Sequence, residues 1–247
     1  MRQNNLRGNP DTAVLIAGVR TGGTFLCTAL SNHPQIFCTR GEPAHAKSRW
    51  RTAAPDWQAR MELLWFQQWY EISMFKLTEQ QAFWPPGWEF IQQQRPLTKI
   101  IYLRRENVLQ QALSNMINVL KGEGKAQGHE THTFQSLEPP NIKIPPNRLV
   151  NVYKASVART EKALMALNKC NLPILYLTYE QITGDVDASY LPEDVSNTIC
   201  DFFQVNRIKM YSHLKKVHTR PYSETVSNWD EVLDALQSRG YDVSRYT

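Results

Sequence analysis

The chain has 247 residues, of which 42% are hydrophobic and 21% charged, a composition typical of a globular protein with a substantial core. Its net charge of +5 favours anionic ligands, but the basic residues form no long run of the kind that binds nucleic acid. Segment 1–11 is polar rather than signal-like, and no apolar run reaches membrane-spanning length, so we expect a cytoplasmic protein whose partners include neither nucleic acid nor a membrane.

Strands and helices are expected to alternate in the first half of the chain. The almost uninterrupted apolar run at 13–19 predicts a parallel strand covered on both faces, and a helix should follow at about 24–32, ending before Pro34. Three further elements are expected: a short strand at 35–38, a helix at 56–70 and a strand at 72–77.

The second half continues the alternation. The expected elements are a strand at 98–103, a helix at 106–120 capped by Asn107, a helix at 147–167, a strand at 173–179, and helices near 193–203 and 224–238. Segment 121–146 is rich in Gly, Pro and polar residues and predicts a long mobile loop that acts as a lid. The whole pattern predicts one α/β domain over 1–247, with a central parallel sheet flanked by helices in a P-loop-like, three-layer fold.

The four cysteines, Cys27, Cys38, Cys170 and Cys200, lie far apart in the sequence. They show no metal-binding spacing such as CxxC, so no metal site is expected. Their apolar surroundings predict buried free thiols, which fits a reducing compartment.

The turn after the first predicted strand has the spacing of a phosphate-binding loop. Gly18 and Gly23 satisfy the glycine half of the P-loop pattern, and backbone N–H groups at the start of a helix can hold an anion. The pattern then requires Lys and Ser or Thr, but the chain has Thr24 and Phe25. Arg20 is the strong cation within the loop, able to bind two oxygens of a phosphate or sulfuryl group.

The stretch RTGGTFLCTALSNHP (20–34) resembles the 5′-phosphosulfate-binding loop of sulfotransferases that use 3′-phosphoadenosine-5′-phosphosulfate (PAPS). The stretch KIIYLRRENVLQQALS (99–114) is similar to the family's 3′-phosphate site, where a strand ends in Arg and a Ser follows in the next helix. Weaker matches, FKL (75–77), ILYLTYEQI (174–182) and TRPYSETVSNWDEV (219–232), resemble bacterial members that modify carbohydrates and small metabolites.

The resemblance implies two binding sites on the nucleotide. Residues of the loop, Arg20, Thr21, Gly22, Gly23, Thr24 and Phe25, would hold the 5′-phosphosulfate. Arg105 and Ser114 would hold the 3′-phosphate. Two departures stand out: Arg105 precedes Ser114 by nine positions where many members show eight, which leaves Arg104 open as a second contact, and Gly22-Gly23 replaces the commoner Gly-Ser or Gly-Thr.

The resemblance also implies sulfuryl transfer by in-line displacement, which needs a general base. Glu42, in RGEPAH (40–45), matches the position of the catalytic carboxylate in several carbohydrate sulfotransferases, and His45 is its rival. Lys76, near the end of a predicted strand, is placed to reach the transferring group. Trp84 and Trp88 are candidates for the wall of an acceptor pocket.

Three classes of function therefore remain open. The favoured one is a PAPS-dependent sulfotransferase acting on a hydroxyl or amine of a small molecule or saccharide. The alternatives are a P-loop-like small-molecule kinase, against which the missing GK[ST] counts, and a non-catalytic nucleotide-binding protein.

Overall fold

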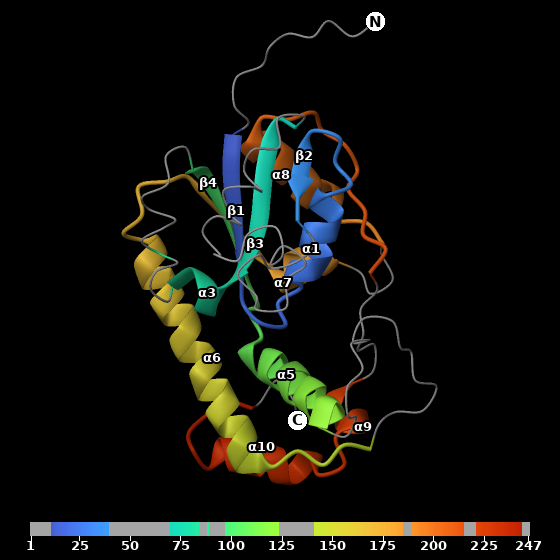
Figure 1. Cartoon of the computed structure of the whole chain (residues 1–247). Helices are drawn as coiled ribbons and strands as arrows, with labels where there is room; N and C mark the ends of the chain where they lie inside the picture. Colours follow the sequence, from blue (N-terminus) through green and yellow to red (C-terminus); the bar gives the residue numbers. More distant parts are fainter. Residues whose placement is uncertain are drawn as a thin grey trace, which may run out of the picture.

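The computed structural model describes residues 11–39, 70–83, 88, 97–123, 141–184, 189–214 and 221–243, whose arrangement is shown in Figure 1. At its centre lies a parallel sheet of five strands in the order β2-β3-β1-β4-β5. The strands are β1 (Asp11–Ala17), β2 (Ile36–Cys38), β3 (Ile72–Thr78), β4 (Leu97–Arg104) and β5 (Ile174–Thr178). The predicted single α/β domain with a parallel central sheet is confirmed.

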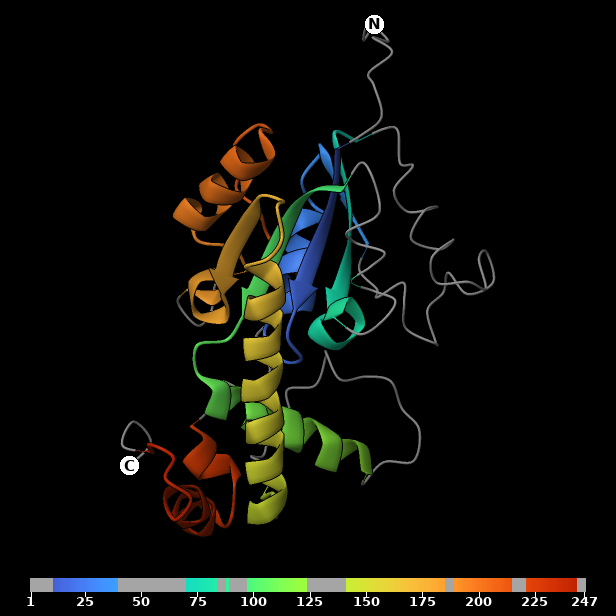
Figure 2. The same cartoon turned by 90° about the vertical axis from the view of Figure 1, so that its left-hand side faces the viewer.

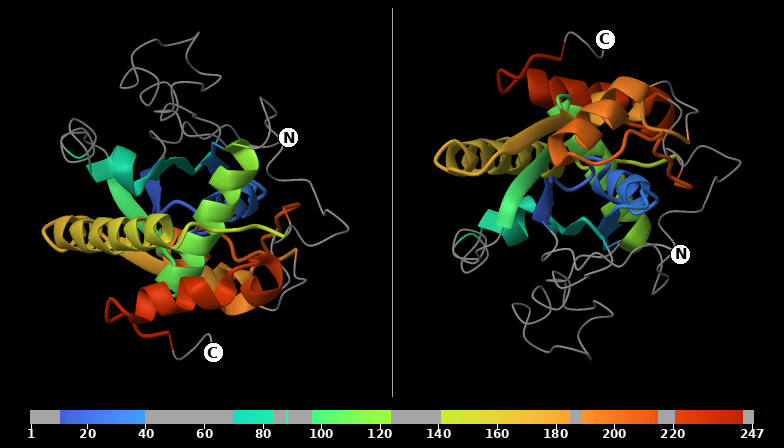
Figure 3. Two further views of the ribbon diagram at one scale, coloured as in Figure 1. Left: turned by 90° about the horizontal axis from the view of Figure 1, so that it is seen from below. Right: turned by 90° about the horizontal axis from the view of Figure 1, so that it is seen from above.

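The middle strand, β1, is buried along its length from Thr12 to Ala17, because it is paired on both sides and covered on both faces. On one face lie α1 (Gly23–Leu30) and α8 (Glu193–Phe203), which join one apolar cluster with Leu15. On the other lie α3 (Glu79–Phe83) and the upper part of α6 (Pro146–Leu167), which pack around Val14 (Figures 2 and 3).

A third apolar cluster lies beyond the carboxyl edge of the sheet. It is formed by α5 (Val108–Glu123), the lower part of α6, and α10 (Trp229–Gln237). The loop between β1 and α1 therefore lies between the sheet and α5 (Figure 1). Among the described residues, none of the helices is both long and apolar enough to cross a membrane.

The ends of the predicted lid segment belong to ordered structure. The helix expected at 106–120 starts at Val108 and continues to Glu123, and the predicted cap is confirmed, since Asn107 Oδ1 accepts the Gln110 N–H at 2.9 Å. At the other end Ile144 is fully buried and α6 begins at Pro146. Residues 124–140 lie outside the described part of the chain.

The predicted helix at 224–238 is two helices, α9 (Tyr222–Thr225) and α10. Asn228 separates them because its side chain bonds both the N–H and the carbonyl of Ile144, each at 2.9 Å. Two short helices were not expected: α3 follows β3, and α7 (Tyr179–Thr183) follows β5. A helix was also predicted at 56–70. Residues 56–69 lie outside the described part of the chain, so that prediction stays untested.

Candidate active site

The turn between β1 and α1 is held by hydrogen bonds that Gly18, its first residue, makes to Leu103 and Thr21. Gly18 N–H donates to the Leu103 carbonyl at 3.2 Å, and the Thr21 N–H and hydroxyl both donate to the Gly18 carbonyl, at 3.3 and 2.7 Å. The backbone is left-handed at Arg20 (φ 63°) and at Gly22 (φ 80°). Two left-handed residues so close together give a tight turn that opens directly into α1.

The glycine pair allows close packing at the end of this turn. A Cβ on Gly22 would lie 2.9 Å from the Tyr179 ring, and one on Gly23 would lie 2.7 Å from the Ala17 Cβ. The departure from the commoner Gly-Ser or Gly-Thr therefore has a steric reason, because a side chain at Gly23 has no room.

The first turn of α1 carries the features of an anion site. Its N-cap, Gly22, makes no side-chain capping bond to the N-terminal N–H groups of the helix, and such groups can bind an anion. Lys76 Nζ donates to Thr24 Oγ1 at 3.1 Å, and Lys76 is only 7% exposed. Phe25 packs against the apolar cluster that α1 and α8 form with Leu15. The structure thus brings a buried ammonium to the loop from β3.

A second cationic group lies beside α5. Arg20 Nε donates to Ser114 Oγ at 3.1 Å, and the charge of Arg105 acts on Arg20. The Tyr222 hydroxyl, from α9, interacts with Ser114 and Arg105 and lies 3.3 Å from the Gln110 carbonyl oxygen. Arg20, which the sequence assigned to the 5′-phosphosulfate, is therefore placed with the residues assigned to the 3′-phosphate.

Arg105 is held on several sides, but one of its donors makes no hydrogen bond among the described residues. Its guanidinium stacks on the Tyr179 ring at 4.3 Å, and its Nη2 donates to Gln110 Oε1 at 2.8 Å. Its Nε is buried and forms an ion pair with Glu180, at 3.8 Å from Oε1, but makes no hydrogen bond among the described residues. Such a buried, unsatisfied donor indicates a place for a ligand oxygen.

Arg104 and Arg105 have different neighbours at the end of β4. Arg104 lies on the same face of β4 as Tyr102 and acts on that tyrosine, on the side covered by α6. Arg105, one residue later, is the one that the structure brings to Arg20 and Ser114.

Burial shapes the electrostatics of this group. It lowers the pKa of Arg20, and the positive charge of Arg105 acts in the same direction, while the phenol of Tyr222 opposes both. Burial also raises the pKa values of Tyr179 and Tyr222, which keeps both phenols protonated as hydrogen-bond donors. Two desolvated guanidinium groups close together favour a multiply charged anion between them.

Several residues of the site were missed by the sequence analysis. Tyr179 is the first residue of α7, which Thr178 and Gln181 start with a reciprocal capping box. The same pair of bonds joins Thr78 and Gln81 at the start of α3, and there the first residue is Glu79. This repeated Leu-Thr-x-x-Gln pattern was the available signal.

Glu79 and Gln111 lie beneath the loop. A Cβ on Gly18 would lie 3.3 Å from Glu79 Oε2 and 3.1 Å from Gln111 Nε2. Gln111 is separated from Ser114 by three positions on α5, and this i, i+3 spacing is the signal that could have identified it. Tyr222 lies in the stretch 219–232 that resembles bacterial sulfotransferases, but the sequence analysis did not single it out as a site residue.

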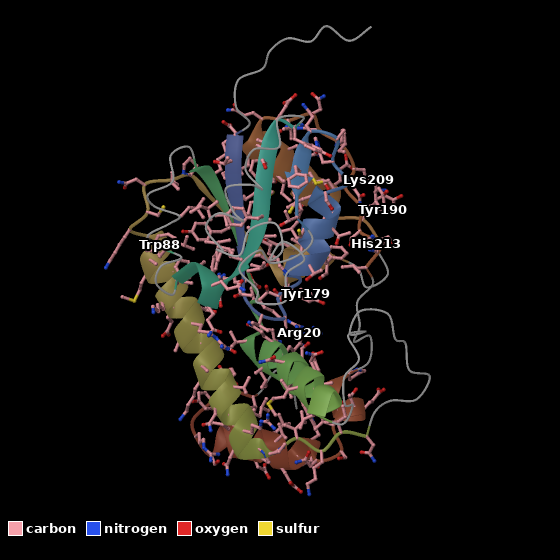
Figure 4. All side chains as sticks on the ribbon, in the orientation of Figure 1. Arg20, Trp88, Tyr179, Tyr190, Lys209 and His213 are labelled. Atoms are coloured by element: carbon pink, nitrogen blue, oxygen red, sulfur yellow. The ribbon has the colours of Figure 1, made fainter. Side chains whose placement is uncertain are left out.

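Other predicted site residues lie elsewhere. Glu42, His45 and Trp84 fall outside the described residues. Trp88 packs on Phe83, with ring centroids 5.0 Å apart, in the apolar cluster beneath α6 and apart from Arg20 (Figure 4). The four cysteines are free; three are buried as expected, and Cys170 is half-buried.

Comparisons with known proteins place this fold. No protein-family model matches the chain, and no curated protein matches it in sequence. A sulfotransferase from Alicyclobacillus acidocaldarius is similar in structure, with a TM-score of 0.50 and 16% identity over 97% of this chain and 99% of that one. The sulfotransferase domain from the curacin biosynthetic pathway is similar with a TM-score of 0.51 and 14% identity, over 81% of this chain and 76% of that one. At these identities the likeness shows a shared fold.

Proposed function

We propose that this chain is a sulfotransferase that uses PAPS and transfers its sulfuryl group to a hydroxyl or amine of a small metabolite or saccharide. The observation that carries the proposal is the pairing of half-buried Arg20 with buried Arg105 around the hydroxyl groups of Ser114 and Tyr222. The fold shared with two sulfotransferases supports it.

The residues present fit such a nucleotide because the site has two separate anion-binding parts. One is the first turn of α1 with Lys76, and the other is the arginine pair beside α5. A nucleotide with phosphates at both the 5′ and 3′ positions needs two such parts. Arg105 Nε, buried without a hydrogen-bond partner among the described residues, is the donor that the 3′-phosphate would satisfy.

PAPS supplies an activated sulfuryl group whose transfer leaves a phosphate. Thr24 and the N–H groups at the start of α1 would bind the 5′-phosphate end. Lys76, held against Thr24, would stabilise the negative charge that develops on the leaving oxygen. Magnesium is not required for this binding, and Phe25 occupies the position where a P-loop NTPase carries a magnesium-binding hydroxyl.

Glu42 is the proposed general base, with His45 as its rival. β2 ends at Cys38 on the carboxyl edge of the sheet, and Glu42 follows four positions later in the sequence. That edge carries the loop and Lys76, so a carboxylate soon after β2 is suitably placed in the chain to take the acceptor's proton. Trp84 remains a candidate for the acceptor pocket.

The test is to incubate the purified protein with PAPS and a library of metabolites and saccharides, and to search by mass spectrometry for products that gain one SO3 group. The expected result is at least one sulfated product that depends on both PAPS and enzyme. Phosphate transfer from magnesium ATP, without sulfation, would favour the kinase alternative instead. Binding of the nucleotide with neither transfer would favour a non-catalytic role.

A further inference from the structure

Helix α5 presses one face against the glycine loop. Gln111 Nε2 donates to the Val19 carbonyl at 2.8 Å, and Ser114 Oγ accepts from Arg20 Nε at 3.1 Å. The two side chains lie three positions apart, hence on the same face of the helix. Adjacent loop residues, Val19 and Arg20, are therefore fastened to the same helix, one through its backbone and the other through its side chain.

The backbone of Arg20 needs this support. Its φ of 63° lies in the left-handed region, which is unfavourable for a residue with a side chain and persists only where the surroundings hold it. Gln111 fixes the carbonyl of the preceding residue, and it is itself only 4% exposed. The fit is tight: a Cβ on Gly18 would lie 3.1 Å from the Gln111 amide nitrogen.

The loop conformation places the Arg20 guanidinium near Arg105. With Val19 held by Gln111, the Arg20 side chain extends to Ser114, in the electrostatic range of Arg105 and Tyr222. Lys76 bonds Thr24 in the first turn of α1. The two cations are therefore separate: the Arg20 guanidinium lies toward α5, and the Lys76 ammonium lies at the start of α1.

We propose that Gln111 is a positioning residue that holds the loop so that Arg20 binds the 3′-phosphate together with Arg105, rather than the transferred group. The inference rests on the proposed function and deepens it. Arg20 then sets the preference for a nucleotide with a 3′-phosphate, and Gln111 acts on that preference through Arg20. The transfer step relies on Lys76 and Thr24.

Calorimetric binding of two probes tests this: 3′-phosphoadenosine 5′-phosphate (PAP) and adenosine 5′-phosphate (AMP), which lacks the 3′-phosphate. The readout is the ratio of the two dissociation constants. Arg20→Asn removes the charge but tolerates the left-handed backbone, and it should lower the preference for PAP by roughly ten- to a hundredfold, as expected for a lost charge-assisted contact.

Gln111→Met is the second variant, and the two are combined in a double-mutant cycle. Gln111→Met alone should lower the PAP preference roughly three- to tenfold, the order expected for an indirect loss. In the Arg20→Asn background it should change the preference no further. Asn118→Met, about two turns away on α5, is the matched control and should leave both affinities unchanged.

The outcomes separate this inference from the proposed function. A wild-type protein that binds PAP and AMP equally contradicts both. A wild-type preference for PAP that survives Arg20→Asn overturns the inference alone. If Gln111→Met weakens PAP and AMP by the same factor, or does so equally in the Arg20→Asn background, Gln111 is merely structural. Should Gln111→Met fail to fold, the Arg20→Asn ratio still decides the role of Arg20.

Discussion

Lys76 and Thr24 meet at the carboxyl edge of the sheet although they come from different elements. Lys76 lies in β3, paired in register with Leu15 of β1, and its ammonium bonds the Thr24 hydroxyl at 3.1 Å. Thr24 is the second residue of α1, where the helix N-terminus is electropositive. A buried cation is thereby fixed at the N-terminal end of α1, which prepares this end for negative charge.

Lys76→Met tests that arrangement, because Met keeps the length of the side chain without the charge. Under the proposed function, the single-turnover rate with saturating PAPS should fall by roughly 10²–10³-fold, as when one stabilising donor is removed from a transition state. Affinity for PAP should change much less. Lys99→Met, on β4 over the Phe202 ring, is the matched control and should retain the wild-type rate. An unchanged rate in Lys76→Met would remove Lys76 from the transfer step.

Gly22 and Gly240 form a matched pair for the loop. Both have φ 80°, but a Cβ on Gly22 would meet the Tyr179 ring at 2.9 Å, whereas one on Gly240 would meet nothing within 4 Å. Gly240→Ala should therefore lower the free energy of unfolding by only about 1 kcal/mol, the cost of a left-handed backbone at a residue with a side chain. Gly22→Ala should lose more and should also weaken PAP binding at least about tenfold, since the ring that supports Arg105 must move.

Urea unfolding and PAP titration of both variants provide the measurement. Equal losses of stability, with PAP affinity intact in both, would mean that the contact between Gly22 and Tyr179 has no role in the site.

Much of this architecture could be predicted from local sequence. The apolar run at 13–19 predicted the central strand, observed at Asp11–Ala17, Asn107 predicted a helix cap, and the limits expected for α8 agree with those observed. Each depends on side chains within a few positions of one another. The split between α9 and α10 could not be predicted in this way, because Asn228 is committed to Ile144, 84 positions earlier.

In the candidate site, too, local features could be predicted from the sequence, whereas features set by distant contacts could not. The glycine spacing predicted a loop and the resemblance predicted Arg105 and Ser114 as partners, but neither indicated which way Arg20 turns. That direction depends on Ser114, 94 positions away, and on the left-handed backbone at Arg20 itself. Tyr222 reaches the group from α9 only because α9 lies beside α5 in the fold.

Glu79 predicts how stability depends on pH. Burial raises the pKa of this carboxyl above its ordinary value near 4.5, while the hydrogen bond from Tyr102 and the charge of Arg159 oppose the rise. In the pH range from about 4.5 up to the folded-state pKa, the folded protein binds more protons than the unfolded chain. The contribution of Glu79 to stability is therefore lost as the pH rises through that range.

Glu79→Gln keeps the shape and an acceptor for Tyr102 but does not ionise. Urea unfolding between about pH 4 and 7 should show this variant gaining stability relative to the wild type as the pH increases. Glu161→Gln, which removes an exposed carboxylate from α6, is the matched control. A difference for Glu79→Gln that is constant, or that shrinks toward neutral pH, would contradict the raised pKa.

The general base is the last prediction, and it concerns Glu42 and His45. If Glu42 accepts the acceptor's proton, Glu42→Gln keeps the side-chain shape and PAP affinity but removes proton acceptance. Single-turnover sulfation with saturating PAPS should then fall by about 10²–10⁴-fold, the usual contribution of a positioned base. His45→Ala should reduce the rate less, because a neighbouring imidazole would only orient the acceptor. If instead His45→Ala is inactive and Glu42→Gln is nearly normal, His45 is the base, and the proposed sulfotransferase activity stands with that one role exchanged.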